Sequence, residues 1–146
     1  MGRISLVDLA EIPGLEELDA FYKGMFGFVP NGVRIMAHRP DIVRGFIQLR
    51  KAVVDPATSE VPVEFKELLG HMASKTAGCR YCQAHTISGA ERAGVDAERL
   101  AAIWEYQTSE LFSPAEKAAL DLAVSAAGVP NAVTDELMAE VRNHWD

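Results

Sequence analysis

The sequence predicts an all-α fold, and three observations lead to this prediction. Apolar residues recur at intervals of three and four along most of the chain. No segment shows the sustained alternation of a strand, and Pro, Gly, Ser, Thr and Asp stand where helices start and stop. We therefore expect a compact bundle of about six to seven helices. The 146 residues suffice for one hydrophobic core, so residues 1–146 are expected to form a single domain.

The first part of the chain contains three predicted helices. One lies within residues 13–27, which open with a proline and close with glycine. Asn31 begins a second, short helix, and Pro40 begins a third. The third helix carries regularly spaced apolar residues on one side, namely Ile42, Phe46, Leu49 and Val53.

The remaining helices are predicted from a strongly amphipathic segment and from a series of caps. Residues 63–76 place Phe65, Leu68 and Met72 on one face, and Gly78 ends that helix. The next helix runs from Cys79 or Arg80 to about Ala93. Three further helices begin at the expected caps Asp96, Ser113 (in a capping box with Pro114 and Glu116) and Thr134. The large side chains at helical spacings are expected in the core: Met25, Met36, Met138, Trp104 and the phenylalanines.

Composition excludes several classes of protein. The net charge is −7 and the fourteen basic residues are scattered, which argues against a nucleic-acid partner. No apolar run approaches the roughly 20 residues of a membrane span, and the N-terminus lacks the apolar segment of a secretory signal. Two cysteines do not make a disulfide scaffold. We expect a cytoplasmic protein without a membrane partner.

The two cysteines, Cys79 and Cys82, form a Cys-x-x-Cys motif at the predicted start of a helix. Unpaired N–H groups and the positive end of the helix dipole face such a position, and they lower the pKa of a thiol. The spacing also allows the two sulfurs to form a disulfide. His85 follows Cys82 by three residues, so its imidazole can take and return the thiol proton. These residues predict thiolate chemistry.

Glu67 is the fourth candidate, because an antiparallel turn at Gly78 places it level with about Gly89, near His85. A carboxylate can orient a histidine that activates a thiol. On a helical wheel Glu67 faces away from the apolar stripe, as does His71. We interpret His71 as the solvated i,i+4 partner of Glu67.

Two other interpretations of the cysteines remain open beside redox chemistry. Cys79, Cys82 and His85 are possible zinc ligands, but a closed zinc site needs a fourth ligand. The pair could also be buried and inert. Within the redox interpretation, the protein is either a peroxidase, or a thiol–disulfide oxidoreductase or redox sensor.

The order Glu67, Cys79, Cys82, His85 resembles the active-site pattern of the alkylhydroperoxidase D-like branch of the carboxymuconolactone decarboxylase family. The stretch from "FGFVPN" to the helix after Pro40 looks like the peroxidase-related subgroup. The family pattern places its relay histidine four residues after the second cysteine. Position 86 is Thr here, and His85 stands one residue earlier.

The resemblance implies a peroxidase without cofactor or resident metal. Cys82 attacks the hydroperoxide and becomes a sulfenic acid, and Cys79 resolves it to a disulfide. Helix-dipole reasoning alone favours Cys79 as the attacking thiol. Cys82 is favoured instead because it is the cysteine closer to His85. The implied partners are a hydroperoxide substrate and a reducing dithiol protein, such as a lipoyl-bearing one. A homo-oligomer, trimer or hexamer, is also implied.

Overall fold

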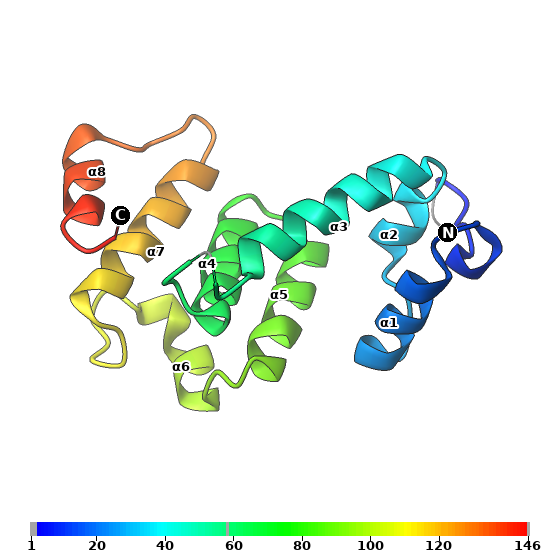
Figure 1. Ribbon diagram of the computed structural model, residues 1–146. Helices are drawn as coiled ribbons and strands as arrows, with labels where there is room; N and C mark the ends of the chain where they lie inside the picture. The colour runs from blue at the N-terminus through cyan, green and yellow to red at the C-terminus, as the bar shows by residue number, and fades with distance from the viewer. Residues whose placement is uncertain (1–2, 58, 146) are drawn as a thin grey trace. The chain divides into compact units, whose positions relative to one another are not determined.

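The computed structural model describes residues 3–57 and 59–145, and these residues form helices and connecting loops without a strand. The all-α prediction is confirmed. Figure 1 shows the order of the helices along the chain. The described residues form eight α-helices and two short 3₁₀ helices: η1 (Leu9–Glu11), α1 (Glu16–Phe26), α2 (Asn31–Met36), α3 (Pro40–Val54), α4 (Val63–Thr76), α5 (Arg80–Arg92), α6 (Ala97–Ala102), η2 (Ile103–Glu105), α7 (Pro114–Ala127) and α8 (Asp135–Arg142).

The chain divides into two units, Met1–Thr58 and Ser59–Asp146. The first unit contains η1 and α1 to α3. Its core is made of apolar side chains from every element, with Leu9 and Val43 fully buried. Gly27 ends α1 with a φ of 77°, a conformation that only glycine adopts without strain. The expectation of a single domain over residues 1–146 stays a prediction.

The second unit contains α4 to α8 and holds the cysteines. The face of α4 that carries Phe65, Leu68 and Met72 is buried in its core, as the amphipathic pattern predicts. Leu120 on α7 and Ile103 in η2 complete that core. Gly78, with a φ of 70°, separates α4 from α5, and these two helices pack along each other.

The predicted helix boundaries agree closely with the structure, and each predicted segment corresponds to one of the eight α-helices of the described residues. The segment expected to form one helix after Asp96 divides into α6 and η2. The capping box of Ser113 and Glu116 is present, and Thr134 caps α8 through its hydroxyl. Among the described residues, every helix is too short or too polar to cross a membrane.

Several side chains expected in the core are on the surface instead. Met25, Phe28 and Trp104 are 44–54% exposed, and so is Phe21. Helical spacing identifies which residues share a face, but it does not determine whether another element covers that face. This part of the prediction was wrong, and most of these exposed side chains lie in the first unit.

Candidate redox site

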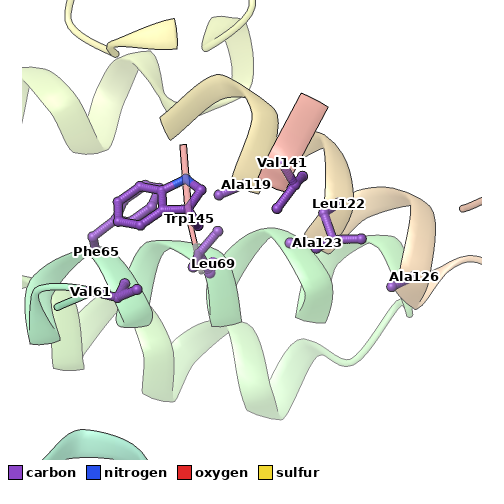
Figure 2. A pocket seen from close by; sticks show the side chains of 9 residues that line it. All are labelled: Val61, Phe65, Leu69, Ala119, Leu122, Ala123, Ala126, Val141 and Trp145. Carbon is purple, nitrogen blue, oxygen red and sulfur yellow. The ribbon is translucent and has the colours of Figure 1, made fainter. Parts of the chain in front are cut away.

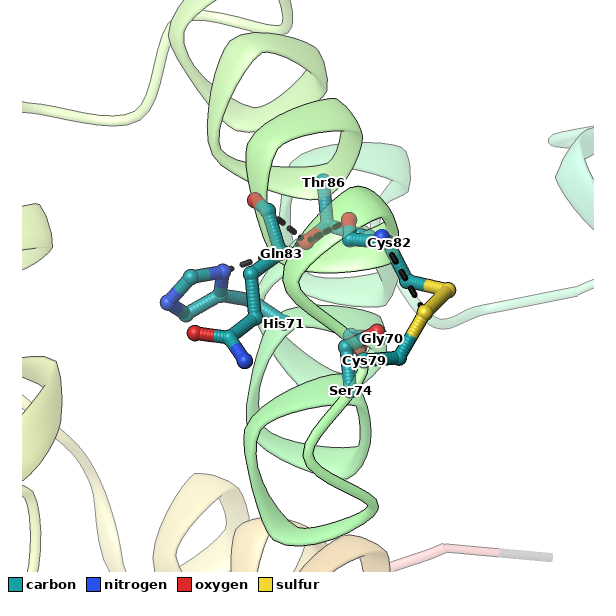
Figure 3. The surroundings of a disulfide bond; sticks show 7 residues. All are labelled: Gly70, His71, Ser74, Cys79, Cys82, Gln83 and Thr86. Carbon is teal, nitrogen blue, oxygen red and sulfur yellow. Dashed lines mark hydrogen bonds between the residues drawn. A yellow bond between two sulfur atoms is a disulfide. The ribbon is translucent and has the colours of Figure 1, made fainter. Parts of the chain in front are cut away.

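Cys79 and Cys82 are joined by a disulfide at the start of α5 (Figure 3). Cys79 is the N-cap of the helix, with extended backbone angles, and its Cα lies 5.3 Å from that of Cys82. The N–H of Cys82 donates a hydrogen bond to the Cys79 Sγ at 3.3 Å. Both cysteines are partly exposed, so the pair is not sealed in the core. The interpretation of the two cysteines as a buried, inert pair therefore does not fit this site.

His85 lies on α5 one turn after Cys82 and is partly buried. Its ring contacts the ring of Tyr81, with the two centroids 4.4 Å apart. Tyr81 stands between the two cysteines in the sequence and is about half exposed. This i,i+4 pair places an imidazole and a phenol on a partly exposed face of the first turns of α5. The sequence singled out His85 but not Tyr81.

Glu67 contacts α5 at the predicted level. A Cβ atom on residue 89 would lie 2.6 Å from the Glu67 Oε2, so the carboxylate lies directly against Gly89. Gly89 is one turn beyond His85 on the same helix. The second face of α4, opposite its apolar stripe, is thus covered by the cysteine helix. The position of Glu67 is confirmed, and its role stays a prediction.

His71 is the residue that the sequence interpretation placed wrongly. It is 3% exposed rather than solvated, and its Nδ1 is hydrogen-bonded to the Thr86 Oγ1 at 3.1 Å. The Thr86 hydroxyl also lies 3.0 Å from the Cys82 carbonyl oxygen, to which it can donate (Figure 3). Position 86 is where the family pattern has its histidine. In this chain position 86 is Thr86, and its hydroxyl is hydrogen-bonded to the imidazole of His71 on α4.

The surroundings of His71 favour its neutral form. Burial lowers the pKa of its imidazole, and the Lys75 ammonium lowers it further, against the opposing effect of the Gln83 carbonyl. The Trp104 ring lies 5.0 Å away, and the Lys75 Nζ sits over that ring. His71 and the disulfide are well separated in Figure 3. His71 therefore contacts the cysteine helix through Thr86 and the Gln83 backbone.

The zinc interpretation requires a set of ligands. Within residues 3–57 and 59–145, no group of three or more His, Cys, Asp or Glu side chains is placed to hold a metal ion. Cys79 and Cys82 are engaged with each other instead.

A cavity of about 260 Å³ lies elsewhere in the second unit, between α4, α7 and α8 (Figure 2). Its lining is apolar throughout, and the Trp145 indole N–H is directed to the Ala115 carbonyl. The cavity therefore offers no polar group that could orient a substrate. It is lined by Val61, Phe65, Leu69, Ala119, Leu122, Ala123, Ala126, Val141 and Trp145.

Residues 40–125, more than half of the chain, match the carboxymuconolactone decarboxylase family. The chain belongs to this family. The match covers α3 to most of α7 and includes both cysteines, Glu67 and His85. The family-level resemblance read from the sequence is confirmed.

The chain is similar in sequence to one curated protein and in structure to two crystal structures of another. The uncharacterized protein YdfG of Bacillus subtilis (strain 168) is 33% identical over 82 residues, which are 56% of each chain. The aligned part thus spans about half the length of that curated relative. Two crystal structures of the debrominase Bmp8 superpose with a TM-score of 0.88 and cover all of this chain and 77% of theirs. One is the apo protein (29% identical) and the other a cysteine-to-alanine variant in complex with 2,3,4-tribromopyrrole (28% identical).

Proposed function

We propose that this carboxymuconolactone decarboxylase family member is a thiol-dependent peroxidase. The observation that carries the proposal is the Cys79–Cys82 disulfide at the start of α5, with both residues partly exposed. Reduction of this disulfide yields a dithiol that can deliver two electrons to a substrate. The position of His85 one turn after Cys82 supports proton transfer at the same place.

The proposed cycle reduces one hydroperoxide to an alcohol and water and oxidises the two thiols to a disulfide. The Cys82 thiolate attacks the terminal oxygen of a hydroperoxide ROOH, an S–O bond forms and the O–O bond breaks. The alkoxide leaves as the alcohol ROH, with a proton delivered by His85. The Cys79 thiolate then attacks the Cys82 sulfenic acid, a disulfide forms, and the hydroxyl leaves as water with a second proton. An external dithiol reduces the disulfide and restores both thiols.

The assignment of the two sulfurs rests on competing observations. Cys79 is the N-cap, and its Sγ accepts the Cys82 N–H, an interaction that stabilises a thiolate at Cys79. A stabilised thiolate suits both a leaving sulfur in the reductive half and a resolving thiol in the oxidative half. Cys82 is the cysteine nearer to His85 in the chain. We therefore assign the attack on peroxide to Cys82 and the resolving step to Cys79.

Stopped-flow peroxide reduction by the pre-reduced protein tests the proposal, with dihydrolipoamide as the recycling dithiol. We expect loss of two thiols per peroxide consumed. Cys82→Ser should abolish consumption, whereas Cys79→Ser should accumulate a sulfenic acid that dimedone traps. Sulfenic acid in Cys82→Ser but not in Cys79→Ser would reverse the assignment. If neither thiol reacts with hydrogen peroxide, cumene hydroperoxide or tert-butyl hydroperoxide, the protein is not a peroxidase, and disulfide exchange or redox sensing is favoured.

Reductive debromination is the second candidate, and the superposition with the debrominase Bmp8 favours it. The same dithiol balances this reaction, because an aryl bromide and two thiols give the debrominated ring, a disulfide, and bromide with a proton. We propose to incubate the pre-reduced protein with 2,3,4-tribromopyrrole and to measure released bromide by ion chromatography. One bromide released per two thiols lost, with no reaction toward hydroperoxides, would replace the first candidate by this one.

A further inference from the structure

Tyr81 is an aromatic residue of the redox site for which the proposed cycle has no step. It stands directly before Cys82 in α5, and its ring lies against that of His85, with an angle of 59° between the ring planes. Tyr81 nevertheless stays 49% exposed, in contrast to the partly buried His85. A half-exposed phenol ring beside a thiol is a candidate contact for the substrate.

The order of three side chains around α5 follows from helix geometry. Successive residues are about 100° apart around the helix axis, which places His85 roughly 40° from Tyr81 and roughly 60° from Cys82. In angle around the axis, His85 therefore lies between the other two, in agreement with its ring contact to Tyr81. The helix surface thus leads from the sulfur to the imidazole and from there to the phenol ring.

The chemistry of the cycle directs the organic group of the substrate along this surface. When the Cys82 thiolate attacks the terminal oxygen of ROOH, the second oxygen leaves on the side opposite to the sulfur and receives its proton from His85. The group R is bonded to that second oxygen, so it lies next to the imidazole on the side away from Cys82. On α5 this is the side of Tyr81, whose ring contacts His85.

The neighbours of Tyr81 at helical spacing, apart from His85, are small. Ala77 and Gly78 stand four and three residues before Tyr81, and Ala84 stands three residues after it. All three are exposed, and none carries more than a methyl group. A flat group bound against His85 can therefore extend over the Tyr81 ring without displacing a large side chain at these positions.

We propose that Tyr81 selects the organic group of the hydroperoxide: its ring and that of His85 form an aromatic face that binds an aromatic group R beside Cys82. This inference rests on the proposed peroxidase function and adds its substrate class, an aryl-substituted hydroperoxide. An aromatic R gains contact with both rings, stacked or edge to face. Hydrogen peroxide, in which R is a hydrogen atom, gains nothing from the aromatic face.

Two tertiary hydroperoxides separate this contact from the peroxide chemistry. Cumene hydroperoxide carries a phenyl ring where tert-butyl hydroperoxide carries a methyl group, so the ratio of their stopped-flow rates measures the contribution of the ring. We expect the pre-reduced protein to prefer cumene hydroperoxide. Tyr81→Ala should lower the ratio roughly two- to tenfold, the range of one aromatic contact, whereas Tyr81→Phe should preserve it. Leu111→Ala, which removes an exposed apolar side chain between η2 and α7, is the control and should also preserve it.

The ratio also distinguishes substrate selection from a purely structural role of Tyr81. If Tyr81 only holds His85 in place, Tyr81→Ala slows the reaction with every hydroperoxide by one common factor, and the ratio stays constant. That result would overturn the proposal. A protein that reduces the two tertiary hydroperoxides equally fast, or a Tyr81→Phe protein that behaves like Tyr81→Ala, would overturn it as well.

A binding measurement on the oxidised protein tests the aromatic face without turnover. NMR spectra record the ring protons of Tyr81 and His85 during titration with 2-phenyl-2-propanol, the alcohol formed from cumene hydroperoxide, and with tert-butanol. We expect the aromatic alcohol to shift both sets of signals and tert-butanol to leave them, and Tyr81→Ala should lose the His85 shifts. Absence of these shifts contradicts the aromatic face. Shifts in a protein whose dithiol reduces no hydroperoxide refute the peroxidase function and retain the face as a binding site for an aryl group.

Discussion

The Glu67 carboxylate occupies the space that a side chain at Gly89 would need. A Cβ atom at position 89 would lie 2.6 Å from the Oε2 and 2.8 Å from the carboxyl carbon of Glu67. Such a distance is shorter than any normal contact. A glycine at position 89 of α5 therefore leaves the space that the Glu67 carboxylate of α4 occupies. Glu67 and α5 are thereby positioned against each other near His85.

Gly89→Ala should displace the Glu67 carboxylate from α5. The side chain is flexible and can turn aside, so we expect the protein to fold with a similar melting temperature. If Glu67 orients the proton relay, Gly89→Ala and Glu67→Gln should lower the rate of peroxide reduction by similar factors. Gly24→Ala is the control, because a Cβ at this helical glycine meets no atom within 4 Å. Full activity of Gly89→Ala together with a slow Glu67→Gln would contradict the positional argument.

His85→Gln should slow the oxidation of the reduced dithiol by peroxide. Proton transfer by a positioned histidine typically contributes a factor of about 100 to 10,000. We expect a loss of at least about 100-fold in the stopped-flow rate at pH 7, with partial rescue by added imidazole. His144→Gln is the matched control, since this histidine follows the end of α8 and pairs with Glu140, away from α5. Equal rates for the two variants would remove His85 from the mechanism.

His71 should make the folded protein less stable in mild acid. Its pKa is lowered from 6.5 in the folded state, so below pH 6.5 the unfolded chain binds a proton that the folded protein does not. The free energy of unfolding should then fall as the pH falls from about 7 through 6.5 and should level off below the folded pKa.

Urea unfolding of the oxidised protein at a series of pH values measures this effect. His71→Gln should flatten the slope of unfolding free energy against pH, whatever its effect at neutral pH. Gln48→Asn, which changes an exposed residue without a titratable group, should leave the slope as it is. A slope that is the same with and without His71 would show that this residue does not titrate differently on unfolding.

Ser113→Ala should weaken the start of α7. The Ser113 Oγ accepts the Glu116 N–H at 3.3 Å, and the Glu116 carboxylate accepts the Ser113 N–H at 2.9 Å. Loss of an N-cap side chain costs about 1 kcal/mol, which urea unfolding can measure. Ser113→Asp retains a capping oxygen and should restore most of the lost stability. If alanine and aspartate behave alike, the cap does not stabilise the fold.

Local sequence signals were sufficient for the helices and for the cysteine motif. The capping box at Ser113, the glycine at position 78 and the stripe of α4 act within a few residues, so they can be read directly from the chain. The same holds for Cys79, Cys82 and His85, whose proximity follows from the geometry of one helix. The level of Glu67 also followed, because a short turn at Gly78 fixes how α5 returns along α4.

Contacts between distant residues required the tertiary structure. His71 and Thr86 are fifteen residues apart, and a helical wheel shows only that His71 lies off the apolar stripe. Whether such a face meets water or another helix depends on what packs there, and α5 covers it. The apolar stripe of α3 is the opposite case, since its pattern suggests burial and its side chains Ile42, Phe46, Leu49 and Val53 are exposed.

The sequence by itself determined that this protein is helical, where its helices begin, and that two thiols and an imidazole lie within the first two turns of one helix. These are consequences of backbone geometry and of periodicity over a few residues. Only the tertiary structure decided that His71 is buried against the cysteine helix and that Phe46 and Leu49 are exposed. The reason is that burial is a property of two surfaces, and a single helix specifies only one of them.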